Sequence, residues 1–418
     1  MNFIELNAKE YSEFIKTNPL NNFLQSPKMD LVANQKGQNV YYVGIKKDKK
    51  ILCGARLIAI NNRFNKKIFY SPRGLIIDYN DKKLLEKFTQ ELKKYIKKKN
   101  GYILHIDPNI LYKQRDINGN LVEHGFDNSN VIKTLKSLGY KHLGFTKGFD
   151  TSKQVRWQFA IDLKGKSEEE IFRNMKPNTR NLISKAQKLG IEVKEMQYEE
   201  LEEFKKITSE TSQRRNFCDK SLEYYQTMYK EFVKEKEAKF LIATLDIEKT
   251  IEKHIKEKEK TVDLLAKLKK CGIESKSSKT KEKILTDKIQ TYNKRITELI
   301  KIKKTDGKKI NLSAAMFMTY GKEVIYSFSG NIAKYMNFNA QYLIQWEMIK
   351  YAIKNNFSKY NFYGITGIFD KNDPDYGVYE FKKGFNGQVE EYIGDFELPI
   401  SSYYSVNKFI KKIKKVYQ

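Results

Sequence analysis

Apolar and polar residues alternate over several short stretches in the first 150 residues, and turn residues separate these stretches. Such runs, rich in β-branched and aromatic residues, are typical of strands. Four of them are VYYVGIKK, ILCGARLIAI, KKIFYSP and YILHIDP, at residues 40–47, 51–60, 66–72 and 102–108. Between residues 84 and 96 the apolar positions instead recur every four residues, with Gly101 beyond them, which predicts one amphipathic helix. The first segment is therefore predicted to be mixed α/β.

A second unit with the same texture begins near Val155. VRWQFAIDL predicts a strand, a basic helix follows Pro177, and Gly190 separates that helix from the strand-like IEVKEM. The fold class expected is α/β (α+β), with one domain over residues 1–150 and a second over residues 151–418.

Strand-forming residues nearly vanish between residues 246 and 306, where charge dominates. Apolar residues there follow a four-three spacing that predicts paired helices. They are Ile251, Ile255, Val262 and Leu265 in the first half, which Lys258 interrupts, and Leu285, Ile289, Tyr292, Ile296 and Leu299 in the second. Cys271-Gly272 and the polar run 274–281 are predicted to form the tip of an antiparallel coiled-coil arm. A solvated, isolated arm is the alternative, but two matched stretches around one polar turn favour pairing.

The α/β pattern resumes after this arm with LSAAMFMTY, GKEVIYSFSGN, a long helix from about Asn339 and the strand YNFYG. The arm is therefore expected to be an insertion within the second domain. The tail KFIKKIKKVYQ predicts a short basic amphipathic helix, which we expect to pack on the protein in preference to a membrane surface.

Composition narrows the class of partner. The chain has 418 residues, a formal net charge of +28 and 40% hydrophobic residues, so it can form real cores and should attract polyanions such as nucleic acid or anionic lipid. A lysine-rich, solvated surface explains the charge equally well. Three separated cysteines, four histidines and the absence of a long apolar run predict a cytoplasmic protein without disulfides or a metal site, at most peripheral to the membrane.

The stretch 360–386, YNFYGITGIFDKNDPDYGVYEFKKGFN, holds the strongest candidate chemistry. It combines an aromatic strand ending in Gly364, a second glycine at 367, and a lysine pair between Phe381 and Phe385. This pattern suits an extended anionic or peptide substrate beside a fixed cation. The structural alternative is a strand, an acidic loop and a second strand with exposed lysines, and on the residues alone we favour it. No nucleophile elbow, metal cluster, Walker loop or pyrophosphate loop is present.

Residues 340–395 resemble the C-terminal core of the FemABX peptidyltransferases, because QWEMI, YNFYG and FKKGFN occur in that family's order and spacing. FLQS at 23–26, HIDP at 105–108, NTRNLISKAQKLGIEV at 178–193 and TSQRRNF at 211–217 extend the resemblance over nearly the whole chain. The resemblance implies two acetyltransferase-like (GNAT-related) domains with an inserted coiled-coil arm. It also implies that Gly, Ser or Ala passes from aminoacyl-tRNA to the third residue of a peptidoglycan stem peptide, or to the growing bridge. The acceptor would be lipid II or UDP-MurNAc-pentapeptide, and no cofactor is implied.

The same resemblance implies the catalytic residues. The family's Phe-Lys pair falls on Phe381 and Lys382, which assigns transition-state stabilisation to Lys382, with Lys383 as a neighbouring candidate. The family's acidic position falls on Asp107, for which a turn-capping role before Pro108 is the alternative. The general base is not identified.

Substrate contacts follow less cleanly from the resemblance. The family's precursor-binding Arg and Tyr fall on Lys220 and Tyr224, and lysine lacks the bidentate fork of arginine. An N-terminal lysine contact falls near Lys28 or Lys36. Tyr363 and Gly364 belong to the proposed substrate groove, and a basic cluster is the candidate tRNA surface, against a solvated helix face: Arg173, Lys176, Arg180 and Lys185.

Two other functions stay open at this stage. A coenzyme A-dependent N-acyltransferase of the same fold would need a pyrophosphate loop that the sequence does not show. A non-catalytic RNA-binding coiled-coil protein would explain the charge, but not the retention of FKKGFN and the Gly-rich loop.

Overall fold

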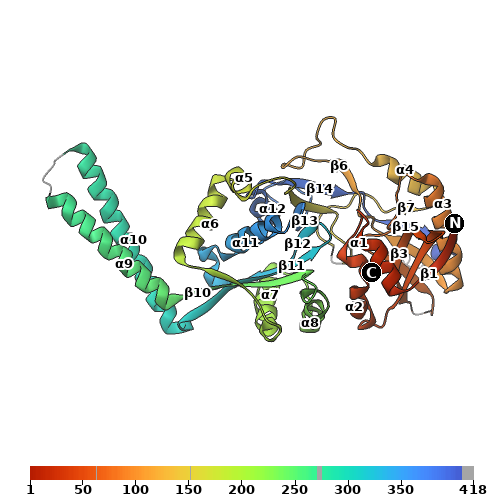
Figure 1. Cartoon of the computed structure of the whole chain (residues 1–418), viewed down its shortest axis with the longest axis horizontal. Coiled ribbons are helices and arrows are strands. Elements are labelled where there is room, and N and C mark those ends of the chain that lie inside the picture. Colours follow the sequence, from red (N-terminus) through yellow and green to blue (C-terminus); the bar gives the residue numbers. More distant parts are fainter. Residues whose placement is uncertain (63, 151, 271–274, 407–418) are drawn as a thin grey trace.

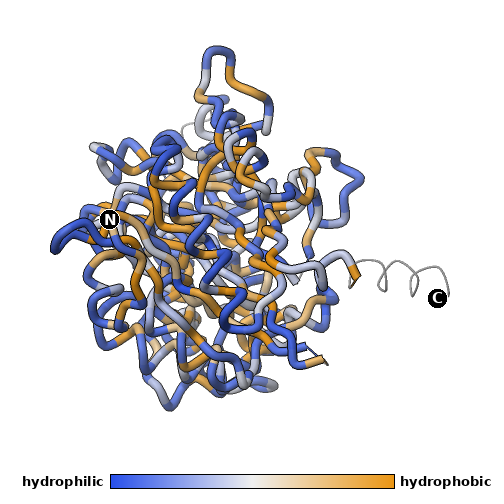
Figure 2. The backbone as a smooth tube through the Cα atoms, turned by 90° about the vertical axis from the view of Figure 1, so that its right-hand side faces the viewer, coloured by the Kyte–Doolittle hydropathy of each residue, from blue (hydrophilic) through white to orange (hydrophobic). Residues whose placement is uncertain are grey.

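The computed structural model describes residues 1–62, 64–150, 152–270 and 275–406. Two mixed β-sheets, each with helices packed on it, lie side by side, and a long helical hairpin projects from the second sheet, away from the first (Figure 1). Hydrophobic stretches run through the body and hydrophilic ones cover most turns at its outline (Figure 2). The predicted mixed α/β class is confirmed.

The first sheet has the strand order β1-β2-β3-β4-β5-β15-β7. Neighbouring strands are antiparallel except for the parallel pair β4 and β5. Its strands are β1 (Asn2–Leu6), β2 (Asn39–Lys47), β3 (Lys50–Asn61), β4 (Lys67–Ser71), β5 (Gly101–Ile106), β15 (Phe396–Pro399) and β7 (Lys141–His142).

Helix α3 (Lys82–Lys98) is the helix predicted from the four-residue spacing. Its apolar residues are buried against the sheet, and Asp81 caps its start by accepting a hydrogen bond from the Leu84 amide. The other helices of this half are α1 (Ala8–Lys16), α2 (Asp30–Asn34) and α4 (Ser129–Ser137), with 3-10 turns η1 (Phe23–Gln25) and η2 (Pro27–Met29).

The second sheet has the order β6-β14-β8-β13-β12-β11-β10-β9, with β12 and β13 parallel. Its strands are β6 (Leu111–Gln114), β14 (Gln388–Tyr392), β8 (Trp157–Asp162), β13 (Lys359–Ile365), β12 (Glu323–Asn331), β11 (Lys309–Tyr320), β10 (Ala238–Asp246) and β9 (Glu192–Glu195).

Helices cover both faces of this sheet (Figure 1). One face carries α5 (Glu168–Asn174), α6 (Pro177–Leu189), α11 (Ala340–Lys354) and α12 (Tyr376–Lys383). The other carries α7 (Leu201–Arg215), α8 (Leu222–Met228) and the π-helical η4 (Tyr229–Val233). Short 3-10 turns are η3 (Tyr198–Glu200) and η5 (Ala333–Phe338). Alternate residues of the central strand β11 therefore enter two different cores.

The two sheets exchange strands across residue 150. Strand β6 precedes that residue but pairs with β14 in the second sheet. Strand β15 follows β14 along the chain but pairs with β5 and β7 in the first sheet. Each sheet thus contains a segment from the other half of the sequence.

The arm consists of α9 (Ile247–Lys270) and α10 (Lys276–Asp306), inserted between β10 and β11. The helices are antiparallel, since Lys303 Nζ lies 2.7 Å from Glu248 at the base and Lys269 Nζ lies 3.1 Å from Glu282 near the tip. Leu299 is buried at the base.

The extent of the predicted polar tip is wrong. Helix α10 already begins at Lys276, because Ser275 caps it by accepting a hydrogen bond from the Ser278 amide. Cys271-Gly272 and the basic tail 408–418 lie outside the described residues. Of the described helices, none is both long and apolar enough to cross a membrane.

Candidate functional site

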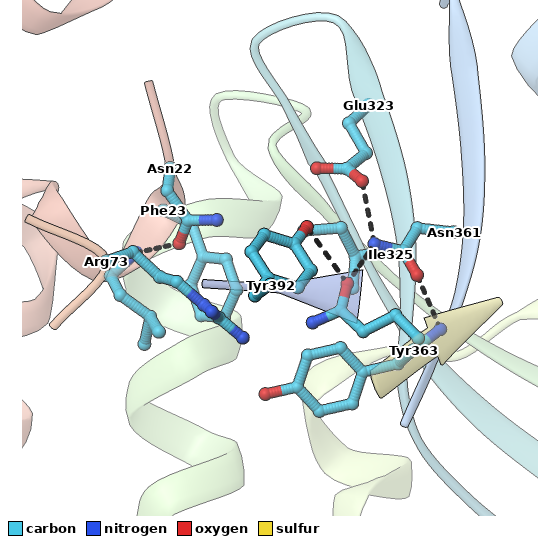
Figure 3. Close-up of a pocket in the computed structure, with 10 residues that line it drawn as sticks. Asn22, Phe23, Arg73, Glu323, Ile325, Asn361, Tyr363 and Tyr392 are labelled. Atoms are coloured by element: carbon cyan, nitrogen blue, oxygen red, sulfur yellow. Dashed lines mark hydrogen bonds between the residues drawn. The ribbon is translucent and has the colours of Figure 1, made fainter. Parts of the chain in front are cut away.

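A pocket lies where the two sheets meet (Figure 3). The first half of the chain contributes the segment before and within η1 and the loop after β4. The second sheet contributes residues from four strands, β8, β12, β13 and β14. The lining residues are Asn22, Phe23, Leu24, Arg73, Gln158, Glu323, Ile325, Asn361, Tyr363 and Tyr392.

Arg73 supplies positive charge to one wall of the pocket. Its side chain is almost fully buried, its Nη2 donates to the Val155 carbonyl at 2.7 Å, and its guanidinium lies over the Tyr392 ring at 4.3 Å. Its backbone amide donates to Asp107 Oδ1 at 2.9 Å, and its Nε lies 3.8 Å from Asp107 Oδ2. The guanidinium is therefore held in place by both halves of the chain.

Asp107 lies directly after β5 and is buried behind Arg73. Burial raises the pKa of this carboxyl to about 6, although the nearby Arg73 opposes the rise. Its Oδ2 accepts no hydrogen bond from any described residue. With this pKa the carboxyl changes its protonation state near neutral pH, although Asp107 is not among the residues that line the pocket.

The opposite wall is a polar network on β8, β12 and β13. Asn361 Nδ2 donates to Gln158 Oε1 at 2.6 Å and to Glu323 Oε1 at 2.8 Å, and the Tyr392 hydroxyl donates to Gln158 Oε1 at 3.3 Å (Figure 3). Lys359 Nζ pairs with Glu323 at 2.8 Å. The pocket is therefore cationic at Arg73, whereas Lys359 neutralises the charge of Glu323.

Lys382 lies in the last turn of α12 and does not line this pocket. Its Nζ donates to the Gly364 carbonyl at 2.5 Å, and burial lowers the pKa of this amine to about 7. Tyr363, the residue before Gly364 on β13, does line the pocket. The carbonyl that Lys382 contacts is therefore one residue away from the pocket lining. The structural alternative predicted a second strand with exposed lysines in this region. The structure has helix α12 there instead, and Lys382 is buried.

The residues beside Lys382 make packing contacts. The Phe381 ring meets Tyr342 edge-on at 4.9 Å between centroids. Lys383 Nζ lies 3.6 Å from Glu380 and 5.2 Å from the centre of the Tyr379 ring.

Lys36, Lys220 and Tyr224 lie together on the side of the pocket marked by Tyr363. Lys220 Nζ lies 5.9 Å from the centre of the Tyr224 ring. Burial, and then the charge of Lys36, lower the pKa of Lys220, while burial and then Tyr363 raise the pKa of Tyr224. Lys28, the other N-terminal candidate, pairs with Glu237 at 2.6 Å.

The predicted tRNA cluster lies on α5 and α6, outside the pocket lining. Arg173 and Lys185 are exposed, Arg180 is half-buried, and Lys176 Nζ lies 3.3 Å from Glu380 of α12. The helices α5 and α6 pack on the same face of the sheet as α12.

The lining residues not named as site residues from the sequence include Arg73 and four polar residues of the second sheet: Gln158, Glu323, Asn361 and Tyr392. Arg73 had a usable signal, since Ser-Pro-Arg-Gly follows a predicted strand that runs parallel to the strand before Asp107. The others lie within ordinary strand patterns and carry no local signal.

Comparisons with known proteins agree over nearly the whole chain. A family model described as the FemAB family matches residues 6–412. The chain is 32% identical over 422 residues to aminoacyltransferase FemA of Staphylococcus epidermidis, covering 99% of this chain and 100% of that protein. It is 31% identical over 423 residues to aminoacyltransferase FemA of Staphylococcus aureus, covering 99% of each. The crystal structure of FemX has a TM-score of 0.78 at 22% identity, covering 96% of this chain and 97% of that one.

Proposed function

The chain belongs to the FemAB family, and from this premise we propose that it moves Gly, Ser or Ala from aminoacyl-tRNA to an amine of a peptidoglycan precursor. It is an aminoacyltransferase of interpeptide bridge synthesis. The observation that carries this function is the match to the FemA aminoacyltransferases, which spans essentially the full length of both chains.

The reaction is the aminolysis of an ester. An acceptor amine attacks the carbonyl that joins the amino acid to the terminal ribose, the carbonyl oxygen becomes an oxyanion, and collapse expels the ribose hydroxyl. The new amide bond forms as the ester bond breaks, and the attacking nitrogen loses one proton. The site must therefore stabilise an oxyanion and accept a proton.

Lys382 is the proposed oxyanion-stabilising residue, with Phe381 holding the end of α12 through its contact with Tyr342. Charge buried in a low-dielectric site interacts more strongly than the same charge in water. The short bond to the Gly364 carbonyl fixes Nζ beside the strand that leads to the pocket. Lys382 thus combines burial with a defined position next to the substrate groove.

Asp107 is the proposed proton acceptor. Its pKa of about 6 leaves it ionised at pH 7 yet basic enough to take up a proton. Its Oδ2 accepts no hydrogen bond from the described residues, and Arg73 Nε lies 3.8 Å from it.

The co-substrates are bound on different surfaces in this proposal. Lys36, Lys220 and Tyr224 contact the precursor, and Lys383 is a secondary contact. Arg173, Lys176, Arg180 and Lys185, with the arm, contact tRNA phosphates. We place the reaction in the cytoplasm, with peripheral contact to the membrane when the acceptor is lipid-linked.

The function is tested by incubating the purified protein with a pool of charged tRNAs and with lipid-linked or UDP-linked pentapeptide, then weighing the products. Acceptors that already carry one bridge residue are included. We expect a mass increase of one or more amino acids. No increase on any acceptor contradicts the proposed function.

Lys382→Ala is the matched test of the catalytic assignment, and Lys383→Ala is its control. We expect Lys382→Ala to lose activity by at least about 100-fold, because removing one oxyanion donor typically costs that much, while its unfolding transition stays cooperative. Lys383→Ala removes a neighbouring lysine that is proposed only as a secondary precursor contact, and should lose far less activity than Lys382→Ala. Near-normal turnover by Lys382→Ala would refute the assignment.

A further inference from the structure

Two buried side chains in the pocket hold hydrogen-bond donors that no described residue uses. Arg73 and Gln158 are each 3% exposed. Arg73 uses Nη2 and Nε toward protein oxygens, which leaves Nη1 without a protein acceptor. Gln158 uses its Oε1 as an acceptor twice, and its Nε2 has no acceptor. Neither free nitrogen is sealed from solvent, so both are open to a ligand in the pocket.

Buried donors are normally satisfied, because an unpaired one has lost its hydrogen bonds to water without a replacement. Arg73 is also incompletely neutralised, since its one carboxylate contact among the described residues, with Asp107, is at 3.8 Å and burial raises the pKa of that carboxyl. A ligand with one negative charge and two acceptor oxygens would neutralise Arg73 and accept hydrogen bonds from the free nitrogens of Arg73 and Gln158. Arginine beside an amide donor matches the flat geometry of a carboxylate.

The remaining walls favour a carboxylate over a phosphate. Glu323 lines the same pocket but is paired with Lys359 at 2.8 Å. Arg73 is therefore the incompletely neutralised charge of the described lining, and one cation matches a singly charged group better than a doubly charged one. Phe23, Ile325 and Tyr363 line the rest of a small space of about 10 Å³, so the end group of a ligand, and not a longer segment, is what this space can receive. A singly charged, planar group on a peptide fits this combination of walls.

We propose that Arg73 and Gln158 form a subsite for the C-terminal carboxylate of the acceptor's stem peptide. The inference rests on the proposed function, because that function supplies a peptide acceptor. In this subsite Arg73, which Asp107 and Tyr392 hold in place, binds one oxygen of the carboxylate. Gln158 binds the second oxygen.

The subsite is tested by calorimetric binding of three UDP-linked pentapeptides to the whole protein, without tRNA. One carries its free carboxylates, one a C-terminal carboxamide, and one a carboxamide only on the second residue. We expect the C-terminal carboxamide to bind at least about tenfold more weakly, equivalent to about 1.4 kcal/mol. If the carboxamide on the second residue weakens binding by this factor and the C-terminal carboxamide does not, the assignment to the C-terminal carboxylate is wrong.

Variants then show whether Arg73 makes the contact. Arg73→Gln should bind the carboxylate and the C-terminal carboxamide equally. Gln158→Glu keeps an oxygen for Asn361 and Tyr392 but adds a negative charge, and should weaken binding of the carboxylate form most. Arg156→Gln is the control, because Arg156 is a buried arginine paired with Glu391 outside the pocket, and it should keep the wild-type preference.

Failure of the inference is distinguishable from failure of the function. If wild-type protein binds all three acceptors equally and still transfers amino acids, the subsite is refuted and the function stands. If Arg73→Gln weakens all three acceptors by the same factor, Arg73 is structural and the subsite is refuted. If no acceptor binds and no transfer occurs, both are refuted.

Discussion

At the scale of single residues, burial brings the pKa values of two groups toward neutrality from opposite sides. Burial favours the neutral form of any ionisable group, so it lowers the pKa of Lys382 to about 7 and raises that of Asp107 to about 6. Both groups therefore change charge within about one unit of physiological pH. The fraction of molecules that hold Lys382 as a cation and Asp107 as a base is therefore highest between about pH 6 and pH 7 and falls on both sides.

The pH dependence of kcat/KM follows from these values. An acceptor lysine has an unperturbed pKa of about 10.4, so its reactive free-amine fraction rises about tenfold per pH unit. Above pH 7, the protonated fraction of Lys382 falls by the same factor, since its folded pKa is about 7. We expect kcat/KM to rise from pH 6 to pH 7 and to level off between pH 7 and pH 9, measured as initial rates at low acceptor concentration.

Lys382→Arg separates the two ionisations, because arginine stays charged throughout this range. Any residual activity of this variant should continue to rise above pH 7. A wild-type rate that still climbs tenfold per unit at pH 9 would show that the charged form of Lys382 is not required.

The sequence indicated single site residues only where a motif or a resemblance marked them. Lys382 and Asp107 lie in FKKGFN and HIDP, and both are buried groups with shifted pKa values. Arg73 and Gln158 were missed, because their partners Val155, Tyr392 and Asn361 are distant in sequence. A side chain whose role depends on long-range contacts leaves no local pattern.

At the scale of elements, helix α7 packs very closely on strand β12. A Cβ built on Gly330 would lie 2.3 Å from the Ile207 carbonyl oxygen, which belongs to the helix backbone. Backbone atoms cannot move aside as a flexible side chain can. Gly330 therefore sets the distance between this helix and the sheet that lines the pocket.

Gly330→Ala should destabilise the protein by about 2 kcal/mol or more, because overpacking forces the helix away from the strand. Gly377→Ala is the control, since a Cβ there meets nothing within 4 Å and the residue lies in α12. Replacing a helical glycine by alanine should stabilise by up to about 1 kcal/mol. Denaturant unfolding measures both, and equal stability of the two variants would contradict the close packing.

Elements with strong periodicity were predictable, and short ones were not. Helix α3 and the helices of the arm have long, regular apolar spacing, and both were predicted. Helix α12 has eight residues and includes a glycine and several aromatic residues, so its pattern does not distinguish a helix from a strand. Its buried lysine also contradicts the usual expectation that charged residues are exposed.

At the scale of the whole molecule, the arrangement of the sheets was the least predictable feature. The sequence predicts two α/β units and an inserted arm, but the strands β6 and β15 have only four residues each. Strand β15 pairs with β5 nearly 300 residues earlier, for example Phe396 with Ile106. Local pattern determines that such a segment is extended but not which sheet it joins.

The exchanged strand makes the first sheet depend on the end of the chain. Phe396 and Leu398 are fully buried in its core, and β15 fills the position between β5 and β7. A chain that ends at Asp395 loses both side chains, each contributing about 1.5–3 kcal/mol by burial, and leaves the edges of β5 and β7 unpaired. We expect its free energy of unfolding to fall by about 5 kcal/mol, measured by denaturant titration.

A chain that ends at Val406 is the control, because it keeps β15 and the Tyr404 hydroxyl that donates to Glu397 at 2.9 Å. Its free energy of unfolding should be close to that of the 418-residue chain. If the two shortened chains are equally stable, β15 is dispensable and each half of the sequence forms its sheet alone. If only the chain ending at Asp395 is destabilised, the first sheet requires β15, which follows the last strand of the second sheet in the sequence. Arg73 follows β4 and Asp107 directly follows β5. The side of the pocket that these two residues form and support would then depend on the same C-terminal strand.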